Sequence, residues 1–384
     1  MPREAVTRPA DDNALPQLAV AGRFIAPDFF PGTVGGVFTR PADLAEEALA
    51  EALTRSWRFV PTALEYQPVG FGSHHWLATD AGGARLFLTV DDLAARLRTA
   101  DDTADAALGR LRRALATALS LRADAGLEFV VAPTPASDGQ VLARLNDRYS
   151  LAVHPYTVGT QIGADGEFTS GSDRIAVLDM VIRLHRAHAA TPETDDLVVP
   201  HLDALRSMMS GPARTWRNGP YAERSRELLR AHAVDLDVLL TAYDDLARRV
   251  ASRGDRLVIT HGEPGAANVM RTPDRGLVLV DWESVLLAPP ERDLWDLADH
   301  DEAILDTYAR ATGVEIDREA LTLYRLWYDL AEIGSYLSLF RGPHGETADT
   351  AESWRNLQHF LRPADRWPAL VERAEGQPTG MTMP

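Results

Sequence analysis

The sequence predicts an α+β protein with two lobes, a small β-rich N-lobe and a larger helical C-lobe. At 384 residues the chain is long enough for two units, since a domain commonly holds about 150 residues. Short strand-like segments occupy the first part of the chain, whereas helical periodicity dominates the remainder. A run of strands followed by a run of helices is typical of the α+β class. We therefore expect an N-terminal extension at 1–40, an N-lobe at 41–156 and a C-lobe at 157–384.

Composition narrows the classes of protein to consider. With 45% hydrophobic and 25% charged residues, the chain resembles an ordinary globular protein. A net charge of −17 argues against a general nucleic-acid binder and favours attraction of cationic small molecules. No apolar run approaches the ~18 residues of a membrane helix, and the N-terminus lacks the apolar stretch of a signal peptide. We expect a cytoplasmic protein, either monomer or homodimer, without a nucleic-acid or membrane partner.

Two residue types are absent from the sequence. Zero cysteines exclude disulfides, zinc-thiolate sites and thiol nucleophiles. All 39 residues counted as Lys or Arg are arginine, so no lysine is available. The chain therefore has no Walker A lysine and no Schiff-base lysine for pyridoxal phosphate.

The N-lobe elements follow from periodicity and turn residues. Residues 1–40 are rich in Pro, Gly and Asp and have no sustained period, as expected of an extension. From Pro41 to Trp57, an apolar side and acidic residues near the start predict an amphipathic helix. Alternating or apolar runs predict strands at 64–68, 75–78, 85–90, 128–132, 141–145 and 149–154, with a helix at 104–122.

A glycine-containing turn joins the first two predicted strands. Gly70 and Gly72 flank Phe71, and Ser73 follows. Glycines let backbone N–H groups approach phosphates closely, so this turn is a candidate nucleotide contact. A simple turn without a ligand would have the same composition, and the two interpretations stay open here. Beyond residue 157, helices are predicted at 174–190, 200–210, 221–252 and 321–340.

Three polar side chains carry the strongest chemical signal. Glu263 follows an apolar run at 257–259, Asn268 comes five residues later, and Asp281 follows a second apolar run at 277–280. Two neighbouring strands would deliver these groups to one place. Asn268 and Asp281 offer the oxygen ligands that Mg²⁺ prefers, and Glu263 can accept a proton from a hydroxyl. The alternative is an ordinary loop and edge strand.

This segment resembles the aminoglycoside phosphotransferase and choline kinase group, which are relatives of the protein kinases. The shared pattern is His261-Gly-Glu263 with Asn268 five residues on, followed by a hydrophobic residue and Asp281-Trp. The resemblance implies a two-lobed protein-kinase-like fold, ATP (or GTP) as co-substrate and Mg²⁺ as cofactor. It also implies that His261 packs beneath the loop and that Asp293 accepts backbone N–H groups from it. Most members have Asp where this chain has Glu263.

The same resemblance shows that this is an atypical member without the N-lobe lysine. Thr89 stands where the third strand would present that lysine, and the helix at 104–122 contains no glutamate to pair with it. Mg²⁺, backbone N–H groups or one of Arg85, Arg96 and Arg98 must then meet the phosphate charge. The sequence does not choose among them.

The segment 154–159 resembles the hinge between the lobes. Its resemblance implies that His154 and Tyr156 contact the nucleotide base, although a connector without a ligand fits these residues nearly as well. In the C-lobe, Tyr328, Asp329 and Glu332 are candidate contacts for an acceptor with ammonium groups, since acidic and aromatic side chains attract cations. An exposed helix face would look the same. Glu283 is a candidate contact for a second metal or for the acceptor.

The expected function is phosphoryl transfer from ATP or GTP to a hydroxyl of a small molecule. The resemblance points to a cationic antibiotic, an amino sugar or a related metabolite, and so to antibiotic resistance or biosynthesis. The alternative is a degenerate kinase fold that binds a nucleotide or small molecule without turnover, which the missing lysine and glutamate favour. Retention of Glu263, Asn268 and Asp281 favours the enzyme.

Overall fold

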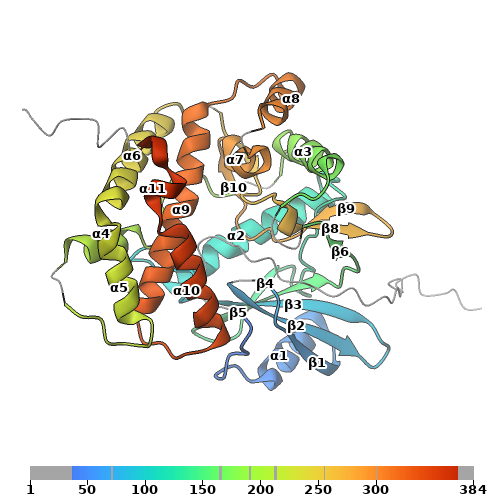
Figure 1. Cartoon of the computed structure of the whole chain (residues 1–384). Helices are drawn as coiled ribbons and strands as arrows, with labels where there is room; N and C mark the ends of the chain where they lie inside the picture. The colour runs from blue at the N-terminus through green and yellow to red at the C-terminus, as the bar shows by residue number, and fades with distance from the viewer. Residues whose placement is uncertain are drawn as a thin grey trace, which may run out of the picture.

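A computed structural model describes residues 37–370, apart from 71, 164–166, 190–191, 212–213, 255 and 300. Most of the expected N-terminal extension therefore lies outside the described residues. The N-lobe is built on a five-stranded antiparallel sheet in the order β1-β2-β3-β5-β4 (Figure 1). The strands are β1 Pro61–Gln67, β2 Ser73–Asp80, β3 Arg85–Asp92, β4 Leu142–Arg144 and β5 Tyr149–Pro155. The predicted strands at these positions are confirmed.

One face of this sheet is covered by the first helix. Alternation along the strands turns Trp76, Leu88 and Leu151 toward that helix, where they pack with Leu49 and Leu53. The helix α1 covers Glu46–Ala52 and continues as a π-helical turn, η1, at Leu53–Trp57. The prediction that it begins at Pro41 was wrong. Residues before it form turns and extended chain, because the Asp43 carboxylate accepts a hydrogen bond from the Tyr149 hydroxyl at 2.7 Å.

The helix α2, Ala104–Ala123, crosses behind the sheet and packs Leu108, Leu111 and Leu115 against Leu142 and its neighbours. The Thr103 hydroxyl caps its N-terminus by accepting from the Ala106 N–H.

No strand forms at 128–132, contrary to the prediction. Val130 makes a single bridge to Leu279, whose backbone bonds to Phe129 and Val131. The apolar run 129–132 is buried all round, and burial alone does not distinguish a strand from a connector.

The C-lobe is helical and is organised around α9, Arg318–Arg341, which contacts α4, α5, α6, α7 and α10 (Figure 1). The other helices are α3 Gly171–His185, α4 Leu202–Ser210, α5 Ala222–Ala231, α6 Ala233–Ala251, α7 Glu291–Ala298, α8 Glu302–Thr312, α10 Ala348–Phe360 and α11 Pro363–Arg366. The predicted helix at 221–252 divides at His232, where the backbone leaves the helical region while the apolar periodicity continues. In the described part of the chain, no helix has the length and apolar character needed to cross a bilayer.

Two small sheets lie in the C-lobe. One contains β6 Thr160–Gln161, β8 Val269–Thr272 and β9 Gly276–Leu279, and the other pairs β7 Val258–Thr260 with β10 Leu286–Ala288. The expected strands β7 and β9 therefore exist but are not paired with each other, because each takes a hairpin or crossover partner instead. Their ends still meet, since His261 Nε2 donates to the Val280 carbonyl at 2.9 Å.

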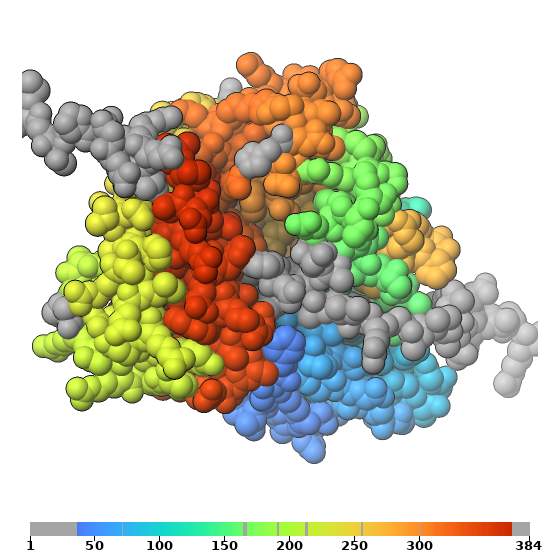
Figure 2. Space-filling view, in the orientation of Figure 1, coloured from blue at the N-terminus to red at the C-terminus, as the bar shows by residue number. Residues whose placement is uncertain are grey.

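The chain just before the N-lobe touches the C-lobe far from the hinge. The Phe38 N–H donates to the Asp349 carboxylate at the start of α10, at 2.8 Å. Figure 2 shows this surface, where the blue N-terminal part meets the orange-red base of α10. The segment that leads into the N-lobe is thus in contact with α10.

Candidate active site

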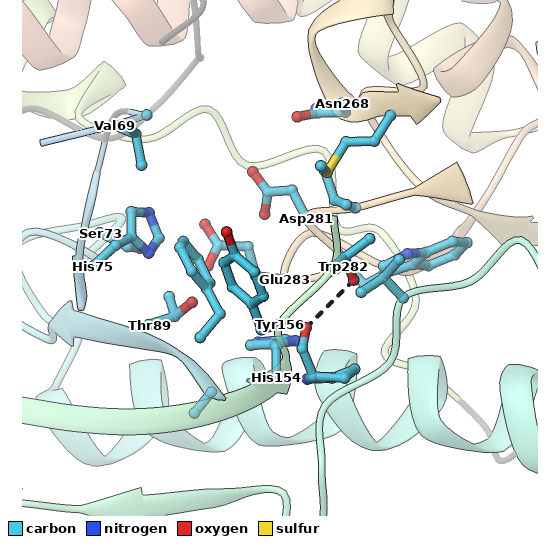
Figure 3. A pocket seen from close by; sticks show the side chains of 18 of the residues that line it. Val69, Ser73, His75, Thr89, His154, Tyr156, Asn268, Asp281, Trp282 and Glu283 are labelled. Carbon is cyan, nitrogen blue, oxygen red and sulfur yellow. Dashed lines mark hydrogen bonds between the residues drawn. The ribbon is translucent and has the colours of Figure 1, made fainter. Parts of the chain in front are cut away.

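A single pocket between the N-lobe sheet and the 268–283 segment collects most of the predicted site residues. Figure 3 shows Ser73, His75 and Thr89 on one side, with Asn268, Asp281 and Glu283 across from them. The predicted residues that line it are Gly70, Ser73, Thr89, His154, Tyr156, Asn268, Asp281 and Glu283. Gly72 is not in the wall of this pocket, although its φ of 81° makes the turn that glycine permits.

Strand alternation decides which N-lobe side chains face the pocket. His75, Thr89 and Ala152 stand opposite one another on β2, β3 and β5 and all line it. Asp91, two residues beyond Thr89, therefore faces the same way. Sequence reasoning missed Asp91 and His75, and this period of two was the signal that could have found them.

The hinge end of the pocket is aromatic. Burial lowers the pKa of His75 and of His154 to about 4, so both rings are neutral near pH 7. The His75 ring stacks on Phe87 with 5.0 Å between centroids. The Arg85 guanidinium lies 4.4 Å from the ring centroid of Tyr156. A flat ring of a ligand would find stacking surfaces here.

The loop after β7 is held by Asp293 from α7. Its carboxylate accepts from the His261 N–H at 2.9 Å and from the Gly262 N–H at 2.6 Å. It also bonds to His185 Nε2 at 3.0 Å. His261 Nδ1 accepts from the Glu263 N–H, while its Nε2 donates to Val280. Asp293 and His261 therefore hold the backbone of this loop in its conformation.

Gly262 is needed for steric reasons. Its φ is 104°, and a Cβ there would lie 2.7 Å from Nη2 of Arg292 and 2.8 Å from Oγ of Ser284. Only glycine fits both this backbone conformation and this space.

Asn268 connects the loop after β7 to the segment that contains Asp281. It ends the short 3₁₀ turn η2, Ala266–Asn268, and its side-chain N–H donates to the Glu263 carbonyl at 2.9 Å. Its own backbone carbonyl accepts from the Val280 N–H at 2.9 Å. The side-chain amide is thus fixed with its nitrogen toward the loop, which leaves its oxygen as the group available to a ligand.

Asp281 adopts an unusual backbone conformation in the pocket wall. Its φ of 64° is uncommon for a residue other than glycine, and such conformations cluster at functional sites. The following side chain, Trp282, is buried and donates to the Leu279 carbonyl at 2.8 Å. Burial raises the pKa of Asp281, and the nearby positive charge of Arg96 opposes that rise.

The donor set at this end of the pocket fits Mg²⁺. Asp281 and Asn268 present carboxylate and amide oxygens from two connected segments. Among residues the structure describes, no cluster of three or more His, Cys, Asp and Glu side chains is arranged to hold a metal ion by itself. Mg²⁺ in phosphoryl-transfer sites commonly takes one or two protein oxygens and completes its shell with phosphate and water.

The opposite side of the catalytic loop is acidic and aromatic. Burial raises the pKa of Glu263 well above its usual value, and the negative charges of Asp281 and Glu332 add to the rise. Glu332 is buried, and Tyr328 contacts Trp295 with 5.0 Å between ring centroids. The structure thus brings Glu332 and Tyr328 close to Glu263.

Asp329 faces elsewhere, contrary to its interpretation as an acceptor contact. Its carboxylate accepts two hydrogen bonds from Arg366, at 2.8 and 2.5 Å, and one from Trp367 Nε1 at 2.7 Å. The physical reason is helical spacing: Asp329 follows Tyr328 on α9 and so points to a different side, where it anchors α11. Its oxygens hold the C-terminal helix.

Glu283 also has a partner within the protein. Its carboxylate accepts from Nη2 of Arg96 at 2.6 Å, and Arg96 also pairs with Asp91. Arg98, in contrast, bonds to Asp196 through both terminal nitrogens, at 3.0 and 2.8 Å, outside the pocket. Of the three arginines considered for the missing lysine, Arg96 is the one bonded to residues of the pocket wall.

Comparison with known proteins agrees with this geometry. The family model of the phosphotransferase enzyme family matches residues 65–324. Protein StrN of Streptomyces griseus is 32% identical over 260 residues, which cover 63% of this chain and 74% of that protein. The residues that the family model matches begin within β1 and include β2 to β5 and the loop after β7.

Among solved structures, spectinomycin phosphotransferase in complex with ADP and spectinomycin superposes with a TM-score of 0.60 at 14% identity. The match covers 88% of this chain and 99% of that one. The AMP complex of the same enzyme gives a TM-score of 0.58 at 14% identity over 86% of this chain and 98% of that one. At this identity the likeness speaks for the fold. The chain belongs to the phosphotransferase enzyme family of small-molecule kinases and has the two-lobed, protein-kinase-like fold.

Proposed function

We propose that the protein transfers the γ-phosphoryl group of ATP, or of GTP, to a hydroxyl of a small molecule. One observation carries this proposal. Asn268 and Asp281 line the same pocket as the N-lobe strands, and Asn268 is bonded to the loop that contains Glu263. In this assignment the N-lobe covers 41–156, the C-lobe covers 157–384 and residues 1–40 form an extension. ATP is a cytoplasmic metabolite, which is in keeping with the expected location.

The nucleotide would occupy the pocket with its base at the hinge end. His154 and Tyr156 provide aromatic surfaces there, and the backbone at Gly70 and Gly72 can approach phosphates. Ser73 and Thr89 add hydroxyl groups to the wall between them. Asn268 and Asp281 would hold Mg²⁺, which when bound neutralises the charge of the phosphate oxygens.

Glu263 would orient the acceptor hydroxyl and accept its proton. The Asn268 and His261 bonds hold the backbone N–H and carbonyl of Glu263, so its side chain leaves the loop from a fixed backbone position. A general base needs to be placed within hydrogen-bond reach of the hydroxyl that it activates. The Asp293 bonds to His261 and Gly262 provide that rigidity from beneath.

The acceptor class that fits is a hydroxylated cation, such as an antibiotic, an amino sugar or a related metabolite. Glu263 and Glu332 place two carboxyl groups, and Tyr328 an aromatic ring, close together on the acceptor side. The overall charge of −17 would draw such molecules toward the protein. Spectinomycin phosphotransferase, whose fold this chain shares, was solved with an antibiotic bound.

A phosphorus NMR scan across hydroxylated cationic compounds tests this function. With ATP and Mg²⁺ present, a new phosphate monoester signal is expected for at least one acceptor, and Asp281→Ala should abolish it. Nucleotide binding without any new ester across amino sugars, aminocyclitols and choline-like compounds would instead establish the binding protein without turnover.

A further inference from the structure

One guanidinium joins the two sides of the nucleotide pocket. Arg96 lies in the turn that follows β3, and its Nη2 bonds to Glu283 at 2.6 Å and to the Ser73 hydroxyl at 2.9 Å. Its Nε donates to Oδ1 of Asp91 at 2.8 Å. The Ser73 hydroxyl donates to the same Asp91 oxygen at 2.8 Å. Residues from β2, β3 and the segment after β9 therefore meet at one side chain.

This arrangement is buried, which makes each member depend on the others. The exposed fractions of the Arg96, Asp91 and Glu283 side chains are 14%, 1% and 19%. Breaking one side of a buried ion pair leaves an uncompensated charge in the protein. Although burial opposes the charged form, Asp91 and Glu283 hold the pKa of Arg96 far above its usual value. Arg96 is therefore a fixed positive charge among carboxylates.

The cation lies behind the pocket wall. Ser73, Asp91 and Glu283 line the nucleotide pocket, whereas Arg96 lines a neighbouring cavity with Leu111 of α2. Oδ2 of Asp91 is buried and has no hydrogen-bond partner among the described residues. Arg96 thus holds the groups that face a ligand and is separated from the ligand by them.

We propose that Arg96 is the positioning residue of this active site and performs the task for which the chain has no lysine and helix glutamate. It fixes Ser73 beside the glycine turn and Glu283 two residues from Asp281, so the phosphate end of the pocket is shaped before the nucleotide enters. The positions of the two charges are exchanged relative to the missing pair. The carboxylate, Asp91, is on β3, where the lysine would stand, and the cation, Arg96, follows the strand. A guanidinium suits this task because its fork can bind two carboxylates at once. The proposal rests on the proposed function for its role in turnover.

Calorimetry with two ligands tests this role without any acceptor. The affinity for ATP with Mg²⁺ depends on contacts at the phosphate end of the pocket, whereas the affinity for adenosine depends on the hinge end alone. Arg96→Ala should lower the affinity for ATP by about 10- to 100-fold, because the buried carboxylates lose their partner. Adenosine affinity should change by less than about threefold, since His154 and Tyr156 stay in place. Arg98→Ala, two residues away and paired with exposed Asp196, is the matched control and should match the wild type.

Arg96→Lys separates positioning from plain structural support. Lysine keeps the charge but has no fork, so it should restore part of the preference for ATP over adenosine. A melting temperature is recorded for every variant. If Arg96→Ala leaves the ratio of ATP to adenosine affinity unchanged, the proposal is overturned, whatever happens to stability. An equal loss for both ligands that lysine does not restore also overturns it.

A double-mutant cycle with Glu283→Gln tests the contact itself. If the pair acts as a unit, Arg96→Ala should cost several-fold less in ATP affinity once Glu283 is neutral, and the remaining loss comes from Asp91, which still lacks its partner. The same cost in both backgrounds would show that the Arg96–Glu283 contact is irrelevant. These binding results stand apart from turnover: without any phosphorylated product the proposed function fails, while the effect on ATP affinity still decides the role of Arg96.

Discussion

The side-chain amide of Asn268 donates a hydrogen bond to the backbone carbonyl of Glu263, with 2.9 Å between the two atoms. This bond joins a candidate metal ligand to the candidate base, so a change at one position is felt at the other. The carbonyl of Asn268 in turn accepts from Val280, the residue before Asp281. The three groups that carry the proposed chemistry are therefore linked through only two hydrogen bonds.

Glu263→Gln should lower turnover by about 10² to 10⁴ while nucleotide affinity changes little, because the amide keeps the shape of the side chain but cannot accept a proton. Steady-state kinetics with the best acceptor, together with calorimetry for the nucleotide, measures both effects. Glu263→Asp is the matched control, since it keeps a carboxylate one methylene shorter and should retain part of the activity. Full activity of Glu263→Gln would assign the base to another group.

Asp281→Asn should weaken nucleotide binding in the presence of Mg²⁺ and leave binding of adenosine nearly unchanged. The physical reason is that an amide offers one neutral oxygen where the carboxylate offers two charged ones to a hard cation. Calorimetry with ATP, with and without Mg²⁺, measures the difference. If the wild type and the variant gain equally from Mg²⁺, the metal is held elsewhere.

Gly262→Ala should destabilise the protein more than Gly276→Ala does. Both glycines have positive φ, 104° and 74°, but only Gly262 has neighbours that a Cβ would strike. Holding alanine at a positive φ costs about 1–2 kcal/mol at either site. The contacts with Arg292 and Ser284 should add about 1–3 kcal/mol at Gly262. Urea denaturation gives both free energies of unfolding. Equal losses for the two variants would mean that the loop moves freely to accept the methyl group.

His154→Gln should make the stability of the protein less sensitive to acid. The folded-state pKa of His154 is about 4, below the value near 6.5 expected for the unfolded chain. Its contribution is thus fully present above pH 6.5 and falls as the pH is lowered toward 4, by up to about 1.4 kcal/mol per pH unit. Unfolding free energies at pH 7.5, 6 and 5 would be compared for the two proteins. Since all other titrating groups are shared, parallel curves would exclude a buried neutral His154.

The sequence was sufficient for the local parts of this structure. Period-two alternation located β1 to β3, and the apolar stripe located α2 within one residue of its end. The spacing from Glu263 to Asp281 located the segment that faces the pocket. Each of these predictions depends on residues that are close together in the sequence, so the pattern is visible in the sequence itself.

Contacts between residues far apart in the sequence could not be predicted. Tyr328 and Asp329 are adjacent in sequence, yet one faces the acceptor side and the other binds Arg366, and only the docking of α11 decides between them. Likewise, nothing in the sequence distinguishes Arg96 from Arg98 as the partner of Glu283. The separation of β7 and β9 into two sheets also depends on partners that the local pattern does not name.

Asp293 gives the catalytic loop a particular place in folding. Its carboxylate binds His261 and Gly262 from the loop and His185 from α3, a residue 108 positions earlier in the chain. Contacts of such sequence separation form only after much loop entropy has been lost. The loop therefore acquires its shape when α3 and α7 have docked. A partly folded chain would contain the N-lobe sheet but not the ordered loop. Assembly of the catalytic loop and completion of the fold are one cooperative event.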